Sequence, residues 1–419
     1  MSGKKQNKKP DLKLEVQEQN EKSSEGNDAL PEELHTEDAI VTVSDENTMD
    51  NTGSQHSNQL FHKAFTRNNI IRGLRILCSI GFVIFLGLFL NENVIQPYRS
   101  KKVIDYTRDL YHRAETDNKL PSETAPILTL TPVPDTTGVT PMPGSVSDAP
   151  TGAPDPSRDE QGRLLQFAEL LAENAETKGW INIPGTDVDY VVVQPDKKDP
   201  EYYLFKGFNK EYSKAGTLFL DPRSSVEANS RNLVIHGHNM VSTKEKMFHS
   251  ILEYKKEISF YREHPTLKFD TIYNTGTWKV FAVFITPPDP AKDYFFEYRK
   301  NSFKSSSEFL NFVYQIRIRS LFNVDAVDIN EKDELLMLST CSYEVNDNYR
   351  TVLVARKVRE GEEPTVDVDR AEMNPKPYYA EDYRRKYGEE IPDVADTFEE
   401  ALEKGQIRWY TPAELKTNE

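Results

Sequence analysis

Apolar residues are concentrated in one uninterrupted stretch near the start of an otherwise polar N-terminal region. Residues 76–90, ILCSIGFVIFLGLFL, contain no charged side chain. As a helix, this stretch covers roughly 22 Å, which is shorter than the ~30 Å hydrocarbon core of a bilayer. It can be extended back to Ile70, because Arg72 and Arg75 can direct their long side chains to the interface. The pattern therefore predicts a transmembrane helix at residues 70–92.

Two other interpretations of this stretch are a buried helix of a globular domain and a cleaved signal peptide. Both are disfavoured, because the stretch follows a long polar tail and Asn91-Glu92-Asn93 is not a small-residue cleavage site. Basic residues lie on both sides of the stretch. The positive-inside rule therefore gives only a slight preference for a cytoplasmic N-terminus.

The segments around this helix have compositions that favour extended or disordered chain. Residues 1–69 are mostly acidic and polar with few aromatic residues, which predicts a disordered tail. Residues 93–156 are expected to form a juxtamembrane segment and a linker. Mixed charge at 99–115 permits a continued helix, whereas nine prolines between positions 121 and 156 exclude helix and sheet interiors. The Pro- and Thr-rich part is predicted to be an extended spacer.

Beyond the linker, short apolar runs separated by turn residues predict a folded domain rich in strands. Apolar residues from Leu164 to Ala175 recur at helical spacing, with Gly179 placed to end that helix, and a second helix is expected at 302–320. The expected strands lie at 188–193, 217–220, 233–235, 278–285, 335–338 and 351–354. Because strands and helices do not alternate regularly, the fold class predicted for residues 157–359 is a mixed β-barrel with peripheral helices.

Residues 360–419 form an acidic extension with its own pattern of short helices. Four tyrosines between positions 378 and 387 are spaced for one face of a helix. Residues 394–404 are predicted to form another helix, ended by Gly405, and residues 411–414 have the capping-box pattern. We expect these helices to pack on the folded domain or to regulate access to it.

The net charge of −16 is located at the two ends of the chain. Residues 1–60 carry −7 and residues 360–419 carry −9, so the segment between them is neutral. A protein that neutralises nucleic-acid phosphates needs a basic face, and no long basic run is present in the sequence, so we expect no nucleic-acid partner. The two cysteines of the chain exclude a disulfide-dense scaffold.

Cys341 is the candidate nucleophile of the folded domain. It lies in LLMLSTCS (335–342), where an apolar strand becomes polar, so its thiol is expected to be more exposed than that of a core cysteine. The other cysteine, Cys78, lies in the predicted transmembrane helix, so the two thiols are not expected to pair. A thiol nucleophile needs a base or an ion-pair partner, together with donors for the oxyanion that forms during acyl transfer.

His236 and His238 are candidate partners for this thiol, because both follow the apolar strand expected at 233–235. In an extended chain their rings point to the same face, an arrangement that also suits a metal ion. No third ligand is evident in the neighbouring sequence, which argues against a metal site. Arg350 begins the strand after Cys341, and its position alone is typical of a solvated residue at a strand end.

Several blocks in this part of the chain resemble sortases. NLVIHGHNM (232–240) and LSTCSYEVNDNYRTVLVARKV (338–358) resemble the two signature blocks of that family, and GWINIPGTDVDYVVVQ (179–194), Tyr202-Tyr203-Leu204 and GTLFLD (216–221) are similar to its class B branch. The resemblance covers residues 160–359, approximately the neutral segment that follows the linker. It implies a sortase-like β-barrel and a cysteine transpeptidase.

The resemblance also implies roles for individual residues. In the family, the histidine of a Gly-His-Asn step, the cysteine of Ser-Thr-Cys and an arginine on the next strand form the catalytic site. By position these residues are His238, Cys341 and Arg350. Ser339 and, less directly, Leu204 match positions that the family associates with substrate binding.

Three residues qualify this assignment. His236 stands where the family usually has tyrosine, so we interpret it as a neighbour of the site. Met337 replaces a threonine that usually precedes Leu-Ser-Thr-Cys, which changes the flank of the motif but none of the proposed catalytic groups. Arg356 is a competing arginine on the same strand face, although its spacing to the cysteine fits the family less well.

The implied reaction is a transfer of a peptide from one amine to another. The cysteine attacks the threonine carbonyl in the C-terminal sorting motif of a surface protein, and a primary amine of peptidoglycan or of a pilin resolves the thioacyl enzyme. No metal or organic cofactor is required. The enzyme is expected in the cell membrane as a single-pass protein in contact with membrane lipid, with a cytoplasmic N-terminus and an extracellular catalytic domain.

Two alternatives remain. One is a cysteine peptidase that hydrolyses its substrate with the same residues. The other is a surface adhesion or scaffold module in which the cysteine has no chemical role. The sequence leaves open the sorting motif, the acceptor amine, the choice between wall anchoring and pilus assembly, and the oligomeric state.

Overall fold

The computed structural model describes residues 67–119, 155, 157–227, 230–240, 246–287, 296–345 and 349–413. Most of the tail predicted for residues 1–69 and most of the Pro- and Thr-rich linker lie outside these residues, so their predicted disorder stays a prediction. The described residues from Arg75 onward form one compact unit, which contains every element from β1 onward.

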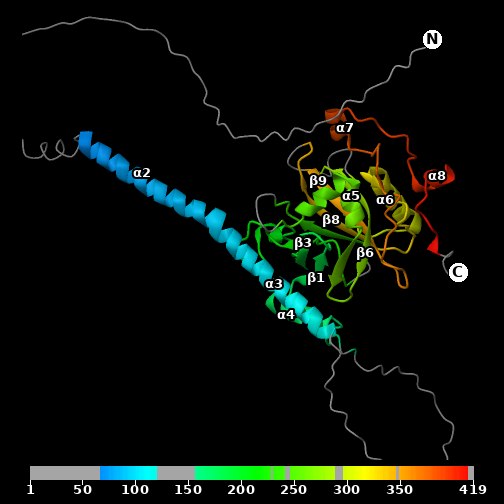
Figure 1. Cartoon of the computed structure of the whole chain (residues 1–419), viewed down its shortest axis with the longest axis horizontal. Coiled ribbons are helices and arrows are strands. Elements are labelled where there is room, and N and C mark those ends of the chain that lie inside the picture. Colours follow the sequence, from blue (N-terminus) through cyan, green and yellow to red (C-terminus); the bar gives the residue numbers. More distant parts are fainter. Residues whose placement is uncertain are drawn as a thin grey trace, which may run out of the picture. The chain divides into compact units, whose positions relative to one another are not determined.

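Eight strands close into a barrel in the part of the chain that the structure describes (Figure 1). Their order around the barrel is β1-β2-β3-β4-β8-β9-β6-β5, and the β2–β3 and β4–β8 pairs are parallel while the other pairs are antiparallel. The strands are β1 (Thr177–Asn182), β2 (Asp189–Val193), β3 (Leu218–Leu220), β4 (Asn232–Gly237), β5 (Thr266–Thr271), β6 (Thr277–Thr286), β8 (Leu335–Ser342) and β9 (Tyr349–Lys357). The mixed β-barrel predicted from the sequence is confirmed.

Helices occupy the connections between the barrel strands. They are η3 (Tyr202–Phe205), η4 (His249–Lys255), α5 (Ile258–Glu263) and α6 (Ser306–Arg319). Helix α6 corresponds to the helix expected at 302–320. The Ser305 side chain caps it by accepting a hydrogen bond from the backbone N–H of Glu308, and Phe309 and Val313 bury its apolar face against the core.

The helix predicted to run from Leu164 up to Gly179 is wrong at its C-terminal end. A 3₁₀ turn, η2 (Leu165–Phe167), leads into α4 (Ala168–Glu173), whereas Gly179 lies inside strand β1. A Cβ atom at Gly179 would lie 2.4 Å from the carbonyl oxygen of Asp270 on β5. The glycine therefore permits a close approach of β5 to β1 instead of ending a helix.

A long helical segment precedes the barrel in the sequence. Helix α2 (Arg67–Leu90) continues through a π-helical turn, η1 (Asn91–Ile95), into α3 (Gln96–Lys119). From Ile71 to Leu90 almost every side chain is apolar and exposed. By length and composition, this is a helix that could cross a membrane.

Helix α3 packs on the barrel, although the linker separates it from the barrel in the sequence (Figure 1). Leu110 and Tyr111 are buried, and the Tyr111 ring stacks on Trp180 of β1 with 4.4 Å between the ring centroids. The Tyr111 hydroxyl also donates to the Asp270 carboxylate at 2.6 Å. The folded part of the protein thus includes a helix that lies before residue 157, where the sequence-based domain begins.

The C-terminal extension also packs on the domain. Its elements are β10 (Glu372–Met373), α7 (Glu381–Tyr387) and α8 (Phe398–Glu403). Strand β10 pairs with β7 (Phe322–Asn323) in a small second sheet. Phe398 and Trp409 are buried, and the Tyr314 hydroxyl of α6 donates to the Ala395 carbonyl at 2.8 Å. Packing on the domain was one of the two roles expected for this extension.

The second helix of the extension is shorter than the predicted range of 394–404. Helix α8 begins at Phe398, because the Thr397 side chain caps it by accepting a hydrogen bond from the N–H of Glu400. It ends before Gly405, which has a φ angle of 65° and allows the chain to turn away.

The tyrosine face predicted for the extension is only partly helical. Tyr383 and Tyr387 belong to α7, whereas Tyr379 precedes it. The Tyr379 and Tyr383 rings stack with 4.2 Å between centroids, and the Tyr387 ring lies tilted against Tyr383 with 4.5 Å between centroids. The capping-box pattern at 411–414 includes Glu414, which lies outside the described residues.

Candidate active site

Strand pairing brings the three candidate residues to the same end of the barrel. Gly237, the last residue of β4, lies opposite Thr340 of β8, so His238 follows at the level of Cys341. On the other side of β8, Cys341 lies directly opposite Arg350 of β9. All three side chains line one cavity of about 550 Å³.

Cys341 is partly exposed, and its backbone is held in place by Asn239. The Asn239 side-chain amide donates to the Cys341 carbonyl oxygen at 3.2 Å, and His249 Nδ1 donates to Oδ1 of Asn239 at 2.7 Å. Asn239 belongs to the His-Gly-His-Asn motif, so the sequence contains a pattern from which this residue can be identified. His249 had no such signal, because its contact with the site depends on where η4 folds back.

His238 is fixed by a backbone carbonyl of η3. Its Nε2 donates to the Leu204 carbonyl oxygen at 2.8 Å, and its ring packs against Phe205 with 5.4 Å between centroids. This bond engages Nε2 and leaves Nδ1 as the nitrogen that can exchange a proton. Burial lowers the pKa of His238, the Leu204 bond opposes that effect, and the charge of Arg350 lowers the pKa further. Neutral imidazole is therefore the favoured form of His238 at neutral pH.

The two arginines of β9 have different surroundings. Arg350 lies in the cavity with Cys341 and donates to the Tyr349 carbonyl at 3.3 Å. Arg356, the competing arginine in the sequence, is completely buried at the opposite end of the strand and pairs with Glu362. The position of Arg356 is that of a structural residue, whereas Arg350 lines the cavity that contains Cys341.

Ser339 and Leu204 both line the same cavity, although in different ways. Ser339 is 1% exposed, and its hydroxyl is hydrogen-bonded to the Tyr298 hydroxyl at 3.0 Å. Leu204 is partly exposed, and its carbonyl accepts the bond from His238. Leu204 thus contributes to the geometry of the site through its backbone as well as to the cavity wall.

His236 belongs to a charged cluster beside the candidate residues. Its Nε2 lies 3.1 Å from Oδ2 of Asp221, and Arg223 donates to both oxygens of that carboxylate at 2.9 Å. Burial by itself raises the pKa of Asp221, but the bonds from Arg223 and His236 outweigh it and hold this pKa well below its usual range. Asp221 and Arg223 line the cavity with His236 and were not identified from the sequence. Among the described residues, no group of three His, Cys, Asp or Glu side chains is arranged to hold a metal ion.

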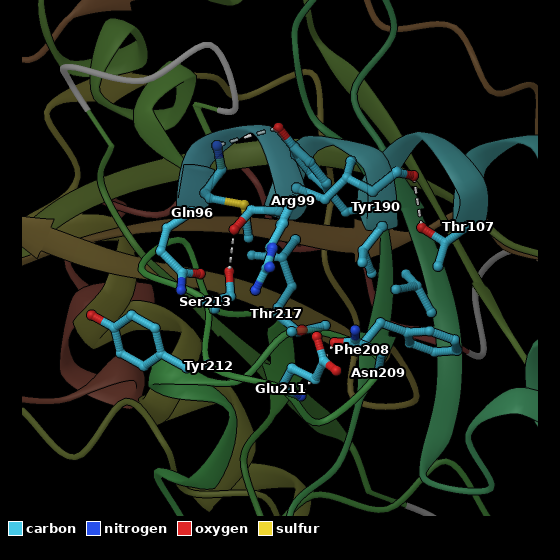
Figure 2. A pocket seen from close by; sticks show the side chains of 18 residues that line it. Gln96, Arg99, Thr107, Tyr190, Phe208, Asn209, Glu211, Tyr212, Ser213 and Thr217 are labelled. Atoms are coloured by element: carbon cyan, nitrogen blue, oxygen red, sulfur yellow. Dashed lines mark hydrogen bonds between the residues drawn. The ribbon is translucent and has the colours of Figure 1, made fainter. Parts of the chain in front are cut away.

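A second cavity of about 230 Å³ lies between α3 and the barrel (Figure 2). Gln96 and Arg99 of α3 line it, together with Tyr190 of β2 and the loop that contains Ser213. The Ser213 hydroxyl is hydrogen-bonded to the Ser100 hydroxyl at 2.9 Å. This cavity contains none of the candidate catalytic residues, so we place the chemistry in the cavity that contains Cys341.

Known proteins resemble this chain over the barrel. Among solved structures, sortase B from Bacillus anthracis in complex with AAEK1 aligns over 63% of this chain and 99% of its own, with 26% identity and a TM-score of 0.46. The Staphylococcus aureus sortase B–substrate complex aligns over 46% of this chain and 85% of its own, with 28% identity and a TM-score of 0.41.

The family comparison and the curated relatives carry the assignment. Residues 181–358 match the family model of the sortase domain. Sortase B of Staphylococcus aureus is 28% identical over 202 residues, which are 48% of this chain and 78% of that protein. Sortase B of Listeria monocytogenes is 29% identical over 179 residues, which are 43% of this chain and 68% of that protein. Residues 181–358 therefore form a sortase domain, and this domain is similar to those of class B sortases, which are transpeptidases.

Proposed function

We propose that Cys341 is the nucleophile of this transpeptidase, that His238 transfers the proton and that Arg350 stabilises the oxyanion. The observation that carries the proposal is the register of β8 and β9. It places Cys341 opposite Arg350 in the cavity that His238 also lines. A nucleophile, a proton carrier and a fork of cationic donors are the groups that acyl transfer requires.

In the first step, the Cys341 thiolate attacks the backbone carbonyl of a threonine in the sorting motif of a surface protein. The negative charge moves to the carbonyl oxygen, where the Arg350 guanidinium donates to it. The C–N bond then breaks, and the leaving amine takes a proton from Nδ1 of the His238 imidazolium. The products are a thioester on Cys341 and a released peptide with a free amino terminus.

In the second step, a primary amine attacks the thioester carbonyl. Neutral His238 accepts the proton that the amine loses, the C–S bond breaks, and Cys341 leaves as a thiolate. A new amide bond joins the surface protein to the acceptor, and the enzyme returns to its starting protonation state. The acceptor amine is proposed to belong to peptidoglycan or to a pilin.

The protonation states of Cys341 and His238 limit the fraction of the enzyme that is active. The first step needs thiolate and imidazolium together, whereas burial and Arg350 favour neutral His238. The reactive ion pair is therefore a minor form at neutral pH. We expect turnover to depend on pH through this population and not only through substrate binding.

The proposed location is the cell membrane, with α2 as a single span. The apolar, exposed side chains of α2 support this proposal, and α3 connects the span to the barrel. We propose that the N-terminus is cytoplasmic and that the barrel is extracellular, where surface proteins and acceptor amines are available.

The test uses the full-length protein and a library of peptides with candidate sorting motifs, with and without an added amine. Mass spectrometry should detect an amide product that contains the amine, and a thioacyl adduct on Cys341. C341A should lose at least about 10³-fold in activity, as expected for loss of a nucleophile. C78A removes the other cysteine and should keep wild-type activity.

Three outcomes would contradict this proposal. Transpeptidation retained in C341A would exclude Cys341 as the nucleophile. A hydrolysed product in the presence of excess amine would favour a cysteine peptidase. If Cys341 fails to react with a thiol-directed probe built on a sorting motif, the chain would be better described as a surface scaffold module.

A further inference from the structure

Helix α7 of the C-terminal extension contacts both ends of the loop that joins β8 to β9. Strand β8 ends with Cys341 and Ser342, and β9 begins with Tyr349 and Arg350. In the barrel register, Cys341 lies opposite Arg350, and Ser342 lies opposite Tyr349. Contacts that hold the two ends of this loop therefore also hold the spacing between the proposed nucleophile and the proposed oxyanion donor.

On the β8 side, α7 binds the backbone of Glu344, three residues after Cys341. The Lys386 ammonium donates to the Glu344 carbonyl oxygen at 2.7 Å, and the Tyr387 hydroxyl donates to the same oxygen. Lys386 also donates to the Val345 carbonyl at 3.3 Å. Both donor side chains are exposed, so each bond is modest by itself, and the three bonds together attach this end of the loop to the helix.

On the β9 side, α7 binds Tyr349, the neighbour of Arg350. The Tyr349 ring is completely buried, and its hydroxyl donates to the Asp382 carboxylate. Burial and the hydrogen bond to Asp382 raise the pKa of Tyr349, so the hydroxyl keeps its proton and stays a donor. Because Arg350 donates to the Tyr349 carbonyl, one residue connects α7 to the guanidinium.

The helix that makes these contacts is attached to the domain by Tyr379 and Tyr383, which are partly buried against the hydrophobic core. Their rings stack on each other, and the Tyr387 ring lies tilted against Tyr383. From the other side, Lys255 of η4 forms an ion pair with the Glu344 carboxylate. Glu344 therefore contacts both η4 and α7, and α7 lies beyond residue 358, where the match to the sortase domain ends.

We propose that α7 is a positioning element of the active site. Its Asp382, Lys386 and Tyr387 hold the chain on the two sides of the β8–β9 connection, at 344–345 and at 349, so that Cys341 and Arg350 keep the separation needed for acyl transfer. This inference rests on the proposed function of those two residues. Because α7 does not line the substrate cavity, loosening it affects the transition state more than substrate binding. The expected signature is a loss in kcat with little change in KM.

The central experiment compares two sets of variants of the full-length protein in a C78A background, where Cys341 is the remaining thiol. K386M/Y387F removes both donors to the Glu344 carbonyl. We expect kcat to fall roughly tenfold with KM within about twofold, because small displacements of reacting groups have large effects on rate. K386R keeps a cationic donor and should retain most of the activity.

R385M is the matched control on the same helix. The Arg385 side chain is 71% exposed and pairs with Glu381 of α7 itself, so its removal leaves the loop contacts in place. Kinetic constants of R385M should equal those of the parent. Y349F provides a second route to the same result, because it keeps the buried ring and removes only the hydroxyl that binds Asp382.

Alkylation of Cys341 by iodoacetamide separates this inference from the proposed function, because it needs neither sorting peptide nor amine. We expect K386M/Y387F to be alkylated roughly threefold faster than the parent, since a loosened loop exposes the thiol more often. If the parent protein transfers no peptide, the proposed function fails, and the alkylation rates still show whether α7 restrains the chain around Cys341.

Two results would overturn the positioning role. One is a K386M/Y387F variant whose kcat and alkylation rate both equal those of the parent. The other is a variant with a lower melting temperature and fewer titratable Cys341 thiols but an unchanged kcat per titrated thiol. In that case α7 stabilises the fold and does not position the site.

Discussion

Arg356 of β9 donates to both carboxylate oxygens of Glu362, with 2.5 and 2.6 Å between the bonded atoms. The arginine has no exposed surface, and the Lys279 ammonium also donates to Glu362 at 2.7 Å. Burial alone raises the pKa of Glu362, but these partners hold it well below its usual range. One carboxylate at the start of the extension therefore pairs with two buried cations of the barrel, and Asp328 lies 3.5 Å from Arg356 as its second anionic partner.

Replacing this carboxylate should destabilise the whole domain. E362Q removes the carboxylate that pairs with Lys279 and leaves Arg356 with only the more distant Asp328, at 3.5 Å, so we expect the free energy of unfolding to fall by about 3 kcal/mol. Chemical denaturation at neutral pH measures this difference. E363Q changes an exposed neighbour and should alter stability by less than about 0.5 kcal/mol. Equal stabilities of E362Q and E363Q would show that the ion pair contributes nothing.

The ion pairs of Glu362 also predict that the stability of the domain decreases in acid. The pKa of Glu362 is lower in the folded protein than the value of 4.5 for a free side chain. Its contribution to stability is therefore fully present above about pH 4.5 and is lost as the pH falls through the lower folded value. E362Q should lack this part of the acid dependence when unfolding is measured at several pH values.

Much of the barrel and the three proposed catalytic residues could be predicted from the sequence, because the signals there are local. Strands β8 and β9 have long apolar runs, and their buried residues appear directly in the pattern. Cys341 and His238 stand where such runs become polar. The motif resemblance then selected Arg350 over Arg356, whose buried ion pairs explain why it is also an arginine.

Other features depend on contacts between distant segments, which a single sequence does not display. The local pattern predicts a helix end at Gly179. The reason for the glycine is the close approach of the β5 backbone, which is some ninety residues away in the sequence. The Leu204 carbonyl holds His238 through the backbone, so no side-chain pattern signals it. Helix α3 docks through few apolar residues on a charged helix, and its partner Trp180 lies beyond the linker.

The packing of α3 on the barrel can be tested by removing the Tyr111 side chain. Y111A removes a ring that stacks on Trp180 and a hydroxyl that binds Asp270, so we expect a loss of about 3 kcal/mol in the free energy of unfolding. The Trp180 emission should shift to longer wavelength as its ring becomes exposed. Y98A, which removes a tyrosine of the same helix that is 69% exposed, should change neither property. Unchanged emission and stability in Y111A would mean that α3 does not dock in solution.

Substitutions of the two arginines of β9 should have different effects, one on activity and the other on stability. R350K keeps a positive charge but loses the fork of donors, so we expect kcat/KM to fall about 10²-fold or more with an unchanged melting temperature. R356K should lower the free energy of unfolding by about 2 kcal/mol, because a lysine cannot make both bonds to Glu362. Its kcat per folded molecule should stay near that of the wild type. The reverse pattern would mean that Arg356 is the functional arginine.

The final prediction concerns the pH dependence of stability that His238 produces. Burial lowers the pKa of His238 below 6.5, and Arg350 adds to this effect against the opposing bond to Leu204. The unfolded chain therefore binds a proton at a higher pH than the folded protein does. Stability should decrease as the pH falls from about 6.5 to the lower folded pKa, and it should be unaffected by this group above 6.5.

H238Q isolates that contribution, because glutamine can still donate to the Leu204 carbonyl but does not titrate. We expect urea denaturation at several pH values between about 5 and 8 to show a steeper acid loss for the wild type than for H238Q. Burial also lowers the pKa of His249, but that residue is present in both proteins, so the difference between them reports His238. Parallel stability curves would mean that His238 titrates alike in the folded and unfolded chains, and the proposed scarcity of the reactive ion pair at neutral pH would lose its basis.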